Sequence, residues 1–570
     1  MKKSILSASI AAMIGGLGFA GLANAGVFAP IAVAPLATGA AAVPANADQQ
    51  TINEAGVGHI LIVPYFTTQG TNATLLNITN TDTINGKLVK IRFRGASNSD
   101  DIFDFTLALS PGDVWAAKVS QGADGRSQLE TGDKSCTLPS FVATQRNSFP
   151  TSRLNPSLTD AQKANETREG YVEILTMADI RPAGFRDQGT AAATPAANAL
   201  FTAIKHVNGV APCTTATLDL LKTDTTGGVQ NGAAAAPVTD TATGKGLTFP
   251  SGRLMANWTI IDTVKTATFS GAAVAVRAGI AGTNTSGLAN LAFFPQSDDL
   301  ATTTAGLDVD TLTADPLLRS TGRIFTDPAT GANTTSTAGR FIAASYYDLP
   351  DLSTPYVGAV GATTAPMIQA KNLTTALAAQ SVFNEYLTTT SIGATTDWVF
   401  SMPTRRYNVA VNYRFTSPLS TNSRVYTDWT TAGSTNHFSS VNTSLVNNQV
   451  CVNADTGAVG VNQWDREETT TSSQFVISPG TVTNVRFCGE TSVLAINNGT
   501  NTASGSLSAS VALQNLNVSA NEGWISLGTS GLNAAGAAAN GTAGLGLPVL
   551  GAAFAKSSSF GAVWPHRFQR

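Results

Sequence analysis

The chain has 570 residues, of which 43% are hydrophobic and only 12% are charged, and its formal net charge at pH 7 is −3. This length exceeds what a single hydrophobic core usually serves, so two or three domains are expected. The charged share is about half the usual one and is not basic, which excludes a nucleic-acid-binding protein, because phosphate recognition needs a basic patch.

The first 25 residues predict an export signal. Lys2 and Lys3 form a short basic start, the uncharged stretch Ser4–Leu22 follows, and Ala23-Asn24-Ala25 carries the small residues that a signal peptidase recognises. A retained anchor is the alternative, but Ser and Gly interrupt the apolar stretch, so cleavage before Gly26 is expected. No later segment approaches the ~20 apolar residues of a spanning helix, and we expect no transmembrane helix in the mature chain.

Beyond an Ala- and Pro-rich leader, the pattern changes to short strands. The apolar run His59–Phe66 contains Pro64, which favours an edge strand because proline donates no hydrogen bond to a ladder. Thr74–Thr79, Phe103–Leu109 and Val114–Val119 continue the series at strand-like spacing.

The segment Leu88–Arg94 alternates strictly between apolar and basic residues. Such a period of two is typical of a strand with one buried face, so Val89, Ile91 and Phe93 are expected inside and Lys90, Arg92 and Arg94 on the opposite face. Further strands are expected over residues 171–175, 258–261, 269–276, 398–400, 409–415, 475–477, 482–487, 507–513 and 524–527.

Helical signals are few. Thr159-Asp160 is a capping signal, Thr194-Pro195 opens a helix that stops at Gly209, and Asn372–Leu387 has a helical apolar pattern. The fold class predicted is mainly β, with antiparallel β-sandwich (Ig-like) domains, a few short helices and long loops.

The expected organisation follows these composition changes. It comprises a signal peptide (1–25), an Ala/Pro-rich leader (26–50), an N-terminal β-sandwich (51–145), a second β-rich region with short helices (146–277), a Thr/Gly-rich insertion (278–340), a C-terminal β-rich domain (341–530) and a Gly/Ala-rich tail (531–570).

The chain has four cysteines: Cys136, Cys213, Cys451 and Cys488. An even count in an exported chain predicts disulfides. Three pairings are possible, and the sequential one keeps each bridge within one half of the chain. A zinc site is the alternative, but it favours close pairs such as C-x-x-C, and the sequence has none.

Signatures of catalysis are missing from the sequence. It contains no G-x-S-x-G elbow, no H-E-x-x-H motif, no P-loop and no complete G-x-G-x-x-G. We therefore predict no catalytic residue, no cofactor and no metal ligand, and a protein that is not an enzyme. The four histidines are scattered and are expected to be hydrogen-bonded structural residues: His59, His206, His437 and His566.

Acidic pairs and tryptophans leave two further possibilities open. Asp100-Asp101, Asp298-Asp299 and Asp308-Val309-Asp310 fit turns better than a glycosidase site, although the third could contribute to a Ca²⁺ site. Four of the seven tryptophans lie beside expected strands, where packing is favoured over stacking on sugars because apolar residues flank them: Trp115, Trp258, Trp398 and Trp524.

Seven short segments stand out in order along the chain: Val63-Pro64-Tyr65-Phe66, Asn77–Thr81, Lys90–Phe93, Leu109–Trp115, Arg168–Ile174, Asp397–Phe400 with Pro403-Thr404-Arg405, and Trp564-Pro565-His566-Arg567. Together they resemble an uncharacterised family of exported proteobacterial proteins, some labelled cell-surface or S-layer-like. The resemblance implies export to the outer envelope of a Gram-negative bacterium and a β-rich body. It implies no known activity or catalytic residue.

The function expected from the sequence is that of a secreted cell-surface structural protein that self-associates, in an S-layer-like manner. A surface adhesin or carbohydrate-binding module for envelope glycans is the alternative. An exported hydrolase and an outer-membrane barrel are less favoured.

Overall fold

The computed structural model describes a defined set of residues. They are 26–28, 46–182, 197–222, 246–264, 267–282, 287–293, 296, 324–326, 333–335, 350–358, 365–411, 413, 423–426, 438, 443–452, 461–467, 487–499, 503–529, 546–558 and 560–570. The expected signal peptide, most of the leader, most of the insertion over 278–340 and the Gly/Ala segment 531–545 lie outside this set.

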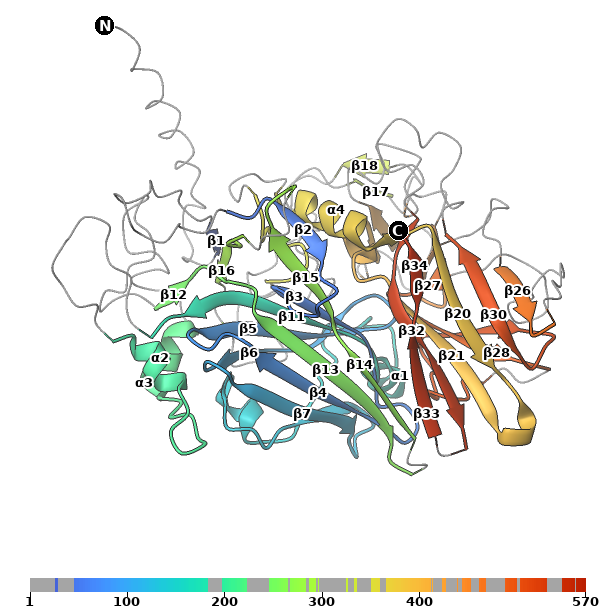
Figure 1. The fold of residues 1–570 in the computed structure, drawn as a ribbon, viewed down its shortest axis with the longest axis horizontal. Helices are drawn as coiled ribbons and strands as arrows, with labels where there is room; N and C mark the ends of the chain where they lie inside the picture. Colours follow the sequence, from blue (N-terminus) through green and yellow to red (C-terminus); the bar gives the residue numbers. More distant parts are fainter. Residues whose placement is uncertain are drawn as a thin grey trace, which may run out of the picture.

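The fold is mainly β, with antiparallel sheets and a few short helices, as the sequence predicts (Figure 1). The first sandwich contains a six-stranded sheet in the order β10-β8-β7-β4-β13-β14. Its strands are β10 (Asn147–Ser148), β8 (Ser127–Glu130), β7 (Val114–Gln121), β4 (Asn72–Asn80), β13 (Leu254–Asp262) and β14 (Thr268–Ala272).

The facing sheet of this sandwich runs in the order β2-β15-β3-β11-β5-β6-β9, with β12 beside β11. Its strands are β2 (Gln49–Ile52), β15 (Val274–Gly279), β3 (Ile60–Thr67), β11 (Glu169–Ile180), β5 (Gly86–Gly95), β6 (Asp101–Leu109), β9 (Cys136–Leu138) and β12 (Leu247–Thr248). Both sheets take strands from 51–145 and from 146–277, so the two regions separated in the sequence analysis form one sandwich.

The strand that contains Pro64 is a correction to the sequence analysis, because β3 lies inside its sheet between β15 and β11 rather than at an edge. Its ladder with β15 covers only Ile60–Ile62, and the β11 ladder shifts register between Gly170 and Val172, which pair with Phe66 and Val63. The proline therefore sits where the missing N–H removes no ladder bond.

The second sandwich is built from a five-stranded and a four-stranded sheet, drawn from yellow to red in Figure 1. The first has the order β29 (Leu513–Asn517), β28 (Thr491–Asn497), β21 (Ala394–Ser401), β32 (Leu550–Ser557) and β33 (Phe560–Pro565), with β28 and β29 parallel. The second has the order β26 (Val461–Asp465), β30 (Glu522–Gly528), β20 (Ser381–Leu387) and β34 (Arg567–Gln569).

Smaller sheets complete the molecule. They are β24 (Thr443–Val446), β25 (Gln449–Val452) and β27 (Phe487–Cys488); β18 (Asn333–Thr335), β17 (Ile324–Thr326), β23 (Arg424–Tyr426) and β22 (Val409–Val411); β1 (Gly26–Phe28) with β16 (Leu291–Phe293); and β19 (Ala378–Ala379) with β31 (Leu547–Pro548). Four strands therefore come from residues 547–569, and the expected tail over 531–570 ends in the body of the second sandwich.

Helices are short and peripheral. α1 (Asp160–Glu166) begins at Thr159 with a complete capping box to Gln162, as the capping signal predicts. α2 (Ala199–Ile204) begins at Asn198, and α3 (Thr215–Leu218) follows it; Thr194-Pro195 lies outside the described residues. Three single-turn 3₁₀ helices bear on the sites below: η1 (Ser140–Ala143), η6 (Thr390–Ile392) and η7 (Arg405–Tyr407).

The helix expected over 372–387 is wrong in its second half. α4 (Ala365–Leu377) ends before Ala378, and Ser381–Leu387 is strand β20, paired on both sides with β30 and β34. The apolar residues Val382 and Tyr386 are buried in the core of the second sandwich. Ladder bonds and core burial from distant chain segments override the local helical pattern here.

The two sandwiches share one continuous core. Val399, Val493 and Phe554 of the second sandwich belong to the same buried cluster as the strands of the first. The Phe554 ring packs 6.2 Å from Tyr65, 5.7 Å from Trp258 and 5.5 Å from Phe269, measured between ring centroids. Aromatic packing of this extent makes the contact between the sandwiches resemble a domain interior.

Candidate functional site

The charged face of β5 is buried, which overturns the expectation that this strand has only one buried face. Lys87, Lys90, Arg92 and Arg94 are each at most 3% exposed. Helices α2 and α4 and the segments 350–358 and 404–411 pack over this side of the sheet and form its outer layer. The alternation along β5 therefore places one row of side chains in the apolar core between the two sheets and the other row in a buried layer of charged residues.

Each cation on this face has a buried acidic partner. Lys87 Nζ lies 2.6 Å from Asp179 and 2.9 Å from Asp82, and Lys90 Nζ donates to Asp104. Arg92 lies 3.0 Å from Asp101, and Arg94 lies 3.4 Å from Glu173. Because a buried charge is costly unless it is paired, these contacts are what makes the burial tolerable.

A second set of buried carboxylates joins the two sandwiches. Glu169 Oε1, on β11, accepts the backbone N–H groups of Ser510 (2.7 Å) and Val511 (2.6 Å). Asp397 Oδ2, on β21, accepts those of Ser506 (2.9 Å) and Leu507 (2.8 Å). The segment 503–512, which has no strand ladder of its own up to Ala512, is therefore held by carboxylates from both sides.

Burial raises the pKa of these carboxyls, because the charged form loses its hydration. The pKa of Asp397 is raised to about 6, and that of Glu169 is raised. Asp100 also has its pKa raised by burial, to about 7, and accepts a hydrogen bond from Tyr413 of the second half (2.7 Å). Its neighbour Asp101 is paired with Arg92 and Arg153.

The described histidines lie apart on separate elements. His59 accepts the Ala278 N–H at Nδ1 (3.1 Å), and His566 Nδ1 lies 2.9 Å from the Asn384 amide. Burial lowers the pKa of both imidazoles to about 3, so both stay neutral. His206 contacts Ser110. His437 and the acidic pairs at 298–299 and 308–310 lie outside the described residues.

The cysteines pair sequentially. Cys136–Cys213 joins β9 to the segment before α3, and Cys451–Cys488 joins directly opposed positions of β25 and β27. Within the ranges that the structure describes, no three His, Cys, Asp or Glu side chains are grouped to hold a metal ion. No described helix has the length and apolar character needed to cross a bilayer.

Tryptophans divide into a buried and an exposed set. Trp115, Trp258 and Trp398 are buried, as the packing interpretation expects. Trp524 on β30 is 39% exposed and stacks on Trp464 of β26, with ring centroids 3.8 Å apart and planes 9° apart. Trp464 was not singled out from the sequence, although its place beside Asp465 in a short alternating segment was a usable signal.

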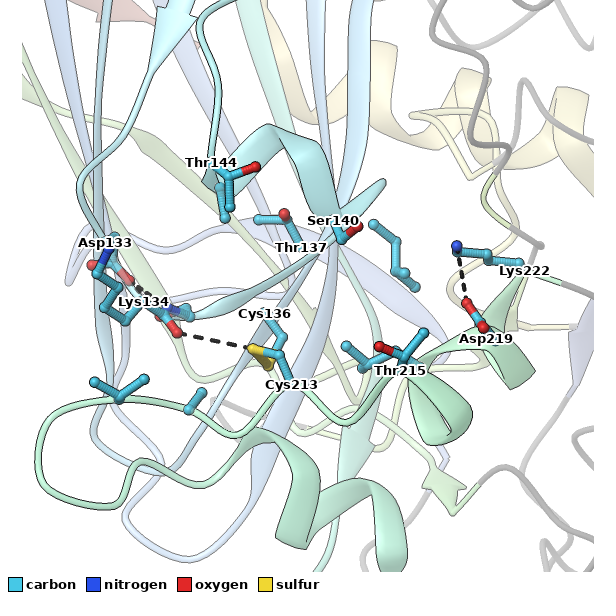
Figure 2. A pocket seen from close by; sticks show the side chains of 16 residues that line it. Asp133, Lys134, Cys136, Thr137, Ser140, Thr144, Cys213, Thr215, Asp219 and Lys222 are labelled. Atoms are coloured by element: carbon cyan, nitrogen blue, oxygen red, sulfur yellow. Dashed lines mark hydrogen bonds and ion pairs between the residues drawn. A yellow bond between two sulfur atoms is a disulfide. The ribbon is translucent and has the colours of Figure 1, made fainter.

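The disulfide Cys136–Cys213 borders a half-open pocket of about 250 Å³ between β9, η1 and α3 (Figure 2). Its apolar lining comes from Leu138, Ala143, Val210, Ala211 and Leu218. Asp133, Lys134, Asp219 and Lys222 stand around it, and Lys222 pairs with Asp219 at 2.9 Å. The pocket is smaller than the ~300–1,000 Å³ of small-molecule sites and has room for one ring.

Comparisons with protein-family models, with curated proteins and with solved structures find no match to this chain.

Proposed function

We propose that this protein is a secreted cell-surface structural protein that associates with copies of itself in an S-layer-like array. The observation that carries the proposal is the distribution of charge. Among the described residues, nine Lys or Arg and ten Asp or Glu are buried, from a total of 34 and 37 in the chain. The 25 Lys or Arg and 27 Asp or Glu that remain nearly balance, and a weak net charge favours association.

Two other features support an extracellular location. Both disulfides suit an oxidising compartment, and residues 1–25 carry the predicted export signal. The resemblance to exported proteobacterial proteins points to the outer envelope of a Gram-negative bacterium. No activity is proposed.

Purified mature protein is expected to form ordered assemblies in negative-stain images, and to fractionate with the outer envelope of its cells. Because the proposed association does not depend on ion pairs, the assembly should persist between about 0.05 and 0.5 M NaCl, where screening would dissolve an ionic contact. A protein that stays monomeric in sedimentation velocity, with an envelope unchanged by deletion of the gene, would contradict the proposal.

A second candidate function, glycan binding, is favoured by the Trp464–Trp524 pair. Half-exposed aromatic rings on a sheet face can stack on sugars, and carboxylates and amides beside them can accept or donate hydrogen bonds to hydroxyls. Glu385 is the register partner of Trp524 on β20, and the Arg466–Glu522 pair lies at the end of the same strands.

Replacing Trp524 with Ala is expected to weaken binding to a responding envelope polysaccharide about 5- to 150-fold, because stacking of a flat ring on one aromatic side chain contributes about 1–3 kcal/mol in nucleic-acid-binding proteins. Binding is measured by a glycan array followed by titration of monomeric protein. Phe560→Ala, which removes an exposed ring elsewhere, is the matched control. Equal binding by wild type and Trp524→Ala would rule out this platform.

A further inference from the structure

Three exposed apolar side chains gather on turns that meet at one end of the molecule. Phe560, at the start of β33, is 80% exposed, the highest value among the large hydrophobic side chains described; Val264 is 71% and Ile392 is 49% exposed. We call these three residues the apolar tip. An exposed apolar cluster of this kind marks an interaction site more often than chance exposure does.

Contacts between the turns fix the apolar tip. Lys556 Nζ pairs with Asp262 Oδ2 at 2.8 Å, which ties the β32–β33 turn to the β13–β14 turn. Ser557 Oγ donates to the Ile392 carbonyl at 2.7 Å, which adds η6. A Cβ on Gly561 would lie 2.6 Å from the Thr268 carbonyl, so the two hairpins are in close contact. Asp262 and Lys556, which join the turns, are buried and neutralise each other.

The pocket beside Cys136–Cys213 lies at the opposite end of the first sandwich. At one end of β4, Thr71 donates to Asp262, beside the apolar tip. At the other end, Asn80 donates to the Ser110 carbonyl, and Ser110 contacts His206, which precedes the turn that carries Val210 of the pocket. Nine residues of β4 separate the ends, about 30 Å at strand rise.

Size and chemistry match the most exposed side chain to this pocket. An apolar cavity of about 150 Å³ is large enough to hold benzene, and the pocket measures about 250 Å³. Its lining is largely apolar, and Val210 at its mouth is 51% exposed. One chain cannot bring its own Phe560 across the length of β4, so the ring must come from another copy.

We propose that Phe560 of one copy inserts into the Cys136–Cys213 pocket of the next copy. This inference rests on the proposed self-association and names its contact. The contact joins two different surfaces, so every bound copy presents a new pocket or a new apolar tip. Such a heterologous contact does not close on a pair, and it builds a ring or an open row of copies.

The test uses the full mature chain and two single variants, one on each side of the contact. Phe560→Ala removes the inserting ring, and Ala143→Leu fills the pocket from η1. Each is expected to weaken the association constant measured by sedimentation velocity about 10- to 100-fold, the change expected when one phenylalanine side chain is no longer buried. Ile368→Ala, a change at a 52% exposed residue of α4, is the control expected to assemble as wild type.

Mixing the two variants separates this contact from other geometries. Ala143→Leu keeps an intact apolar tip and Phe560→Ala keeps an intact pocket, so the mixture should form dimers and stop there. Circular dichroism and the thermal midpoint confirm that each variant is folded, and the second variant tests the proposal independently of the first.

The outcomes are distinguishable. If wild type assembles and at least one of the two variants assembles equally well, this contact is overturned and the proposed function stands. If wild type itself stays monomeric, the proposed function fails and the contact fails with it.

Discussion

Replacing Glu169 with Ala is expected to lower the free energy of unfolding by roughly 3–5 kcal/mol, since each buried donor left without a partner costs about 1–3 kcal/mol. Glu169 is fully buried and accepts hydrogen bonds from Ser510 N, Val511 N and the Tyr65 hydroxyl. It also accepts from the Gln69 amide. Removing the carboxylate leaves the two backbone N–H groups and the Tyr65 hydroxyl without this acceptor at the contact between the sandwiches, while Gln69 keeps its hydrogen bond to Asn165.

Glu169→Gln is the matched control, because a glutamine oxygen can still accept the two backbone N–H groups. Urea unfolding followed by tryptophan fluorescence measures both variants. We expect Gln to retain most of the stability that Ala loses. An Ala variant as stable as wild type would show that the segment 503–512 is held by its other contacts alone.

Wild type and Glu169→Gln also test how the contribution of Glu169 to stability depends on pH. Burial raises the pKa of Glu169 above its ordinary value of 4.5. Between 4.5 and the raised value, the folded state holds a proton that the unfolded state has released, so the stability contributed by this group falls as pH rises. Glu169→Gln lacks this loss and should gain stability relative to wild type from pH 5 to pH 8. A difference that is constant over this range would contradict the raised pKa.

Much of the fold could be predicted from local pattern. Alternation located the core strands β5 and β6, the capping signal at Thr159 located α1, and the cysteine count with sequential spacing matched the disulfides. These features depend on residues close in sequence, or on pairing options few enough to enumerate.

The remainder depends on long-range packing. Lys90, Arg92 and Arg94 have the spacing of a solvent-facing row, and they are buried only by a layer contributed by residues about 100 to more than 300 positions later. Arg405-Arg406 likewise looks like a short basic pair in the sequence but is interior. The apolar tip and its pocket combine turns from distant segments, which no local pattern brings together.

Arg405 leads to the second large effect. Its Nε lies 3.2 Å from Glu490 Oε2, and both side chains are fully buried. Its guanidinium also donates to the Val409 carbonyl at 3.0 Å, while Glu490 accepts the Arg406 N–H at 2.8 Å. The pair thus attaches η7, which covers the ionic face of β5, to the turn between β27 and β28.

Replacing Arg405 with Met is expected to lower the free energy of unfolding by about 3–5 kcal/mol, because it leaves the buried Glu490 carboxylate without its counter-charge. The double variant Arg405→Met/Glu490→Gln removes both charges and should recover part of the loss, so a double-mutant cycle should give a clear coupling energy.

Burial already raises the pKa of Glu490, and losing the arginine raises it further. The folded single variant therefore takes up a proton as pH falls, and its defect should be smaller at pH 5 than at pH 8. Equal defects at both pH values, or purely additive single substitutions, would mean that packing of the Arg405 side chain, and not its charge, holds η7 in place.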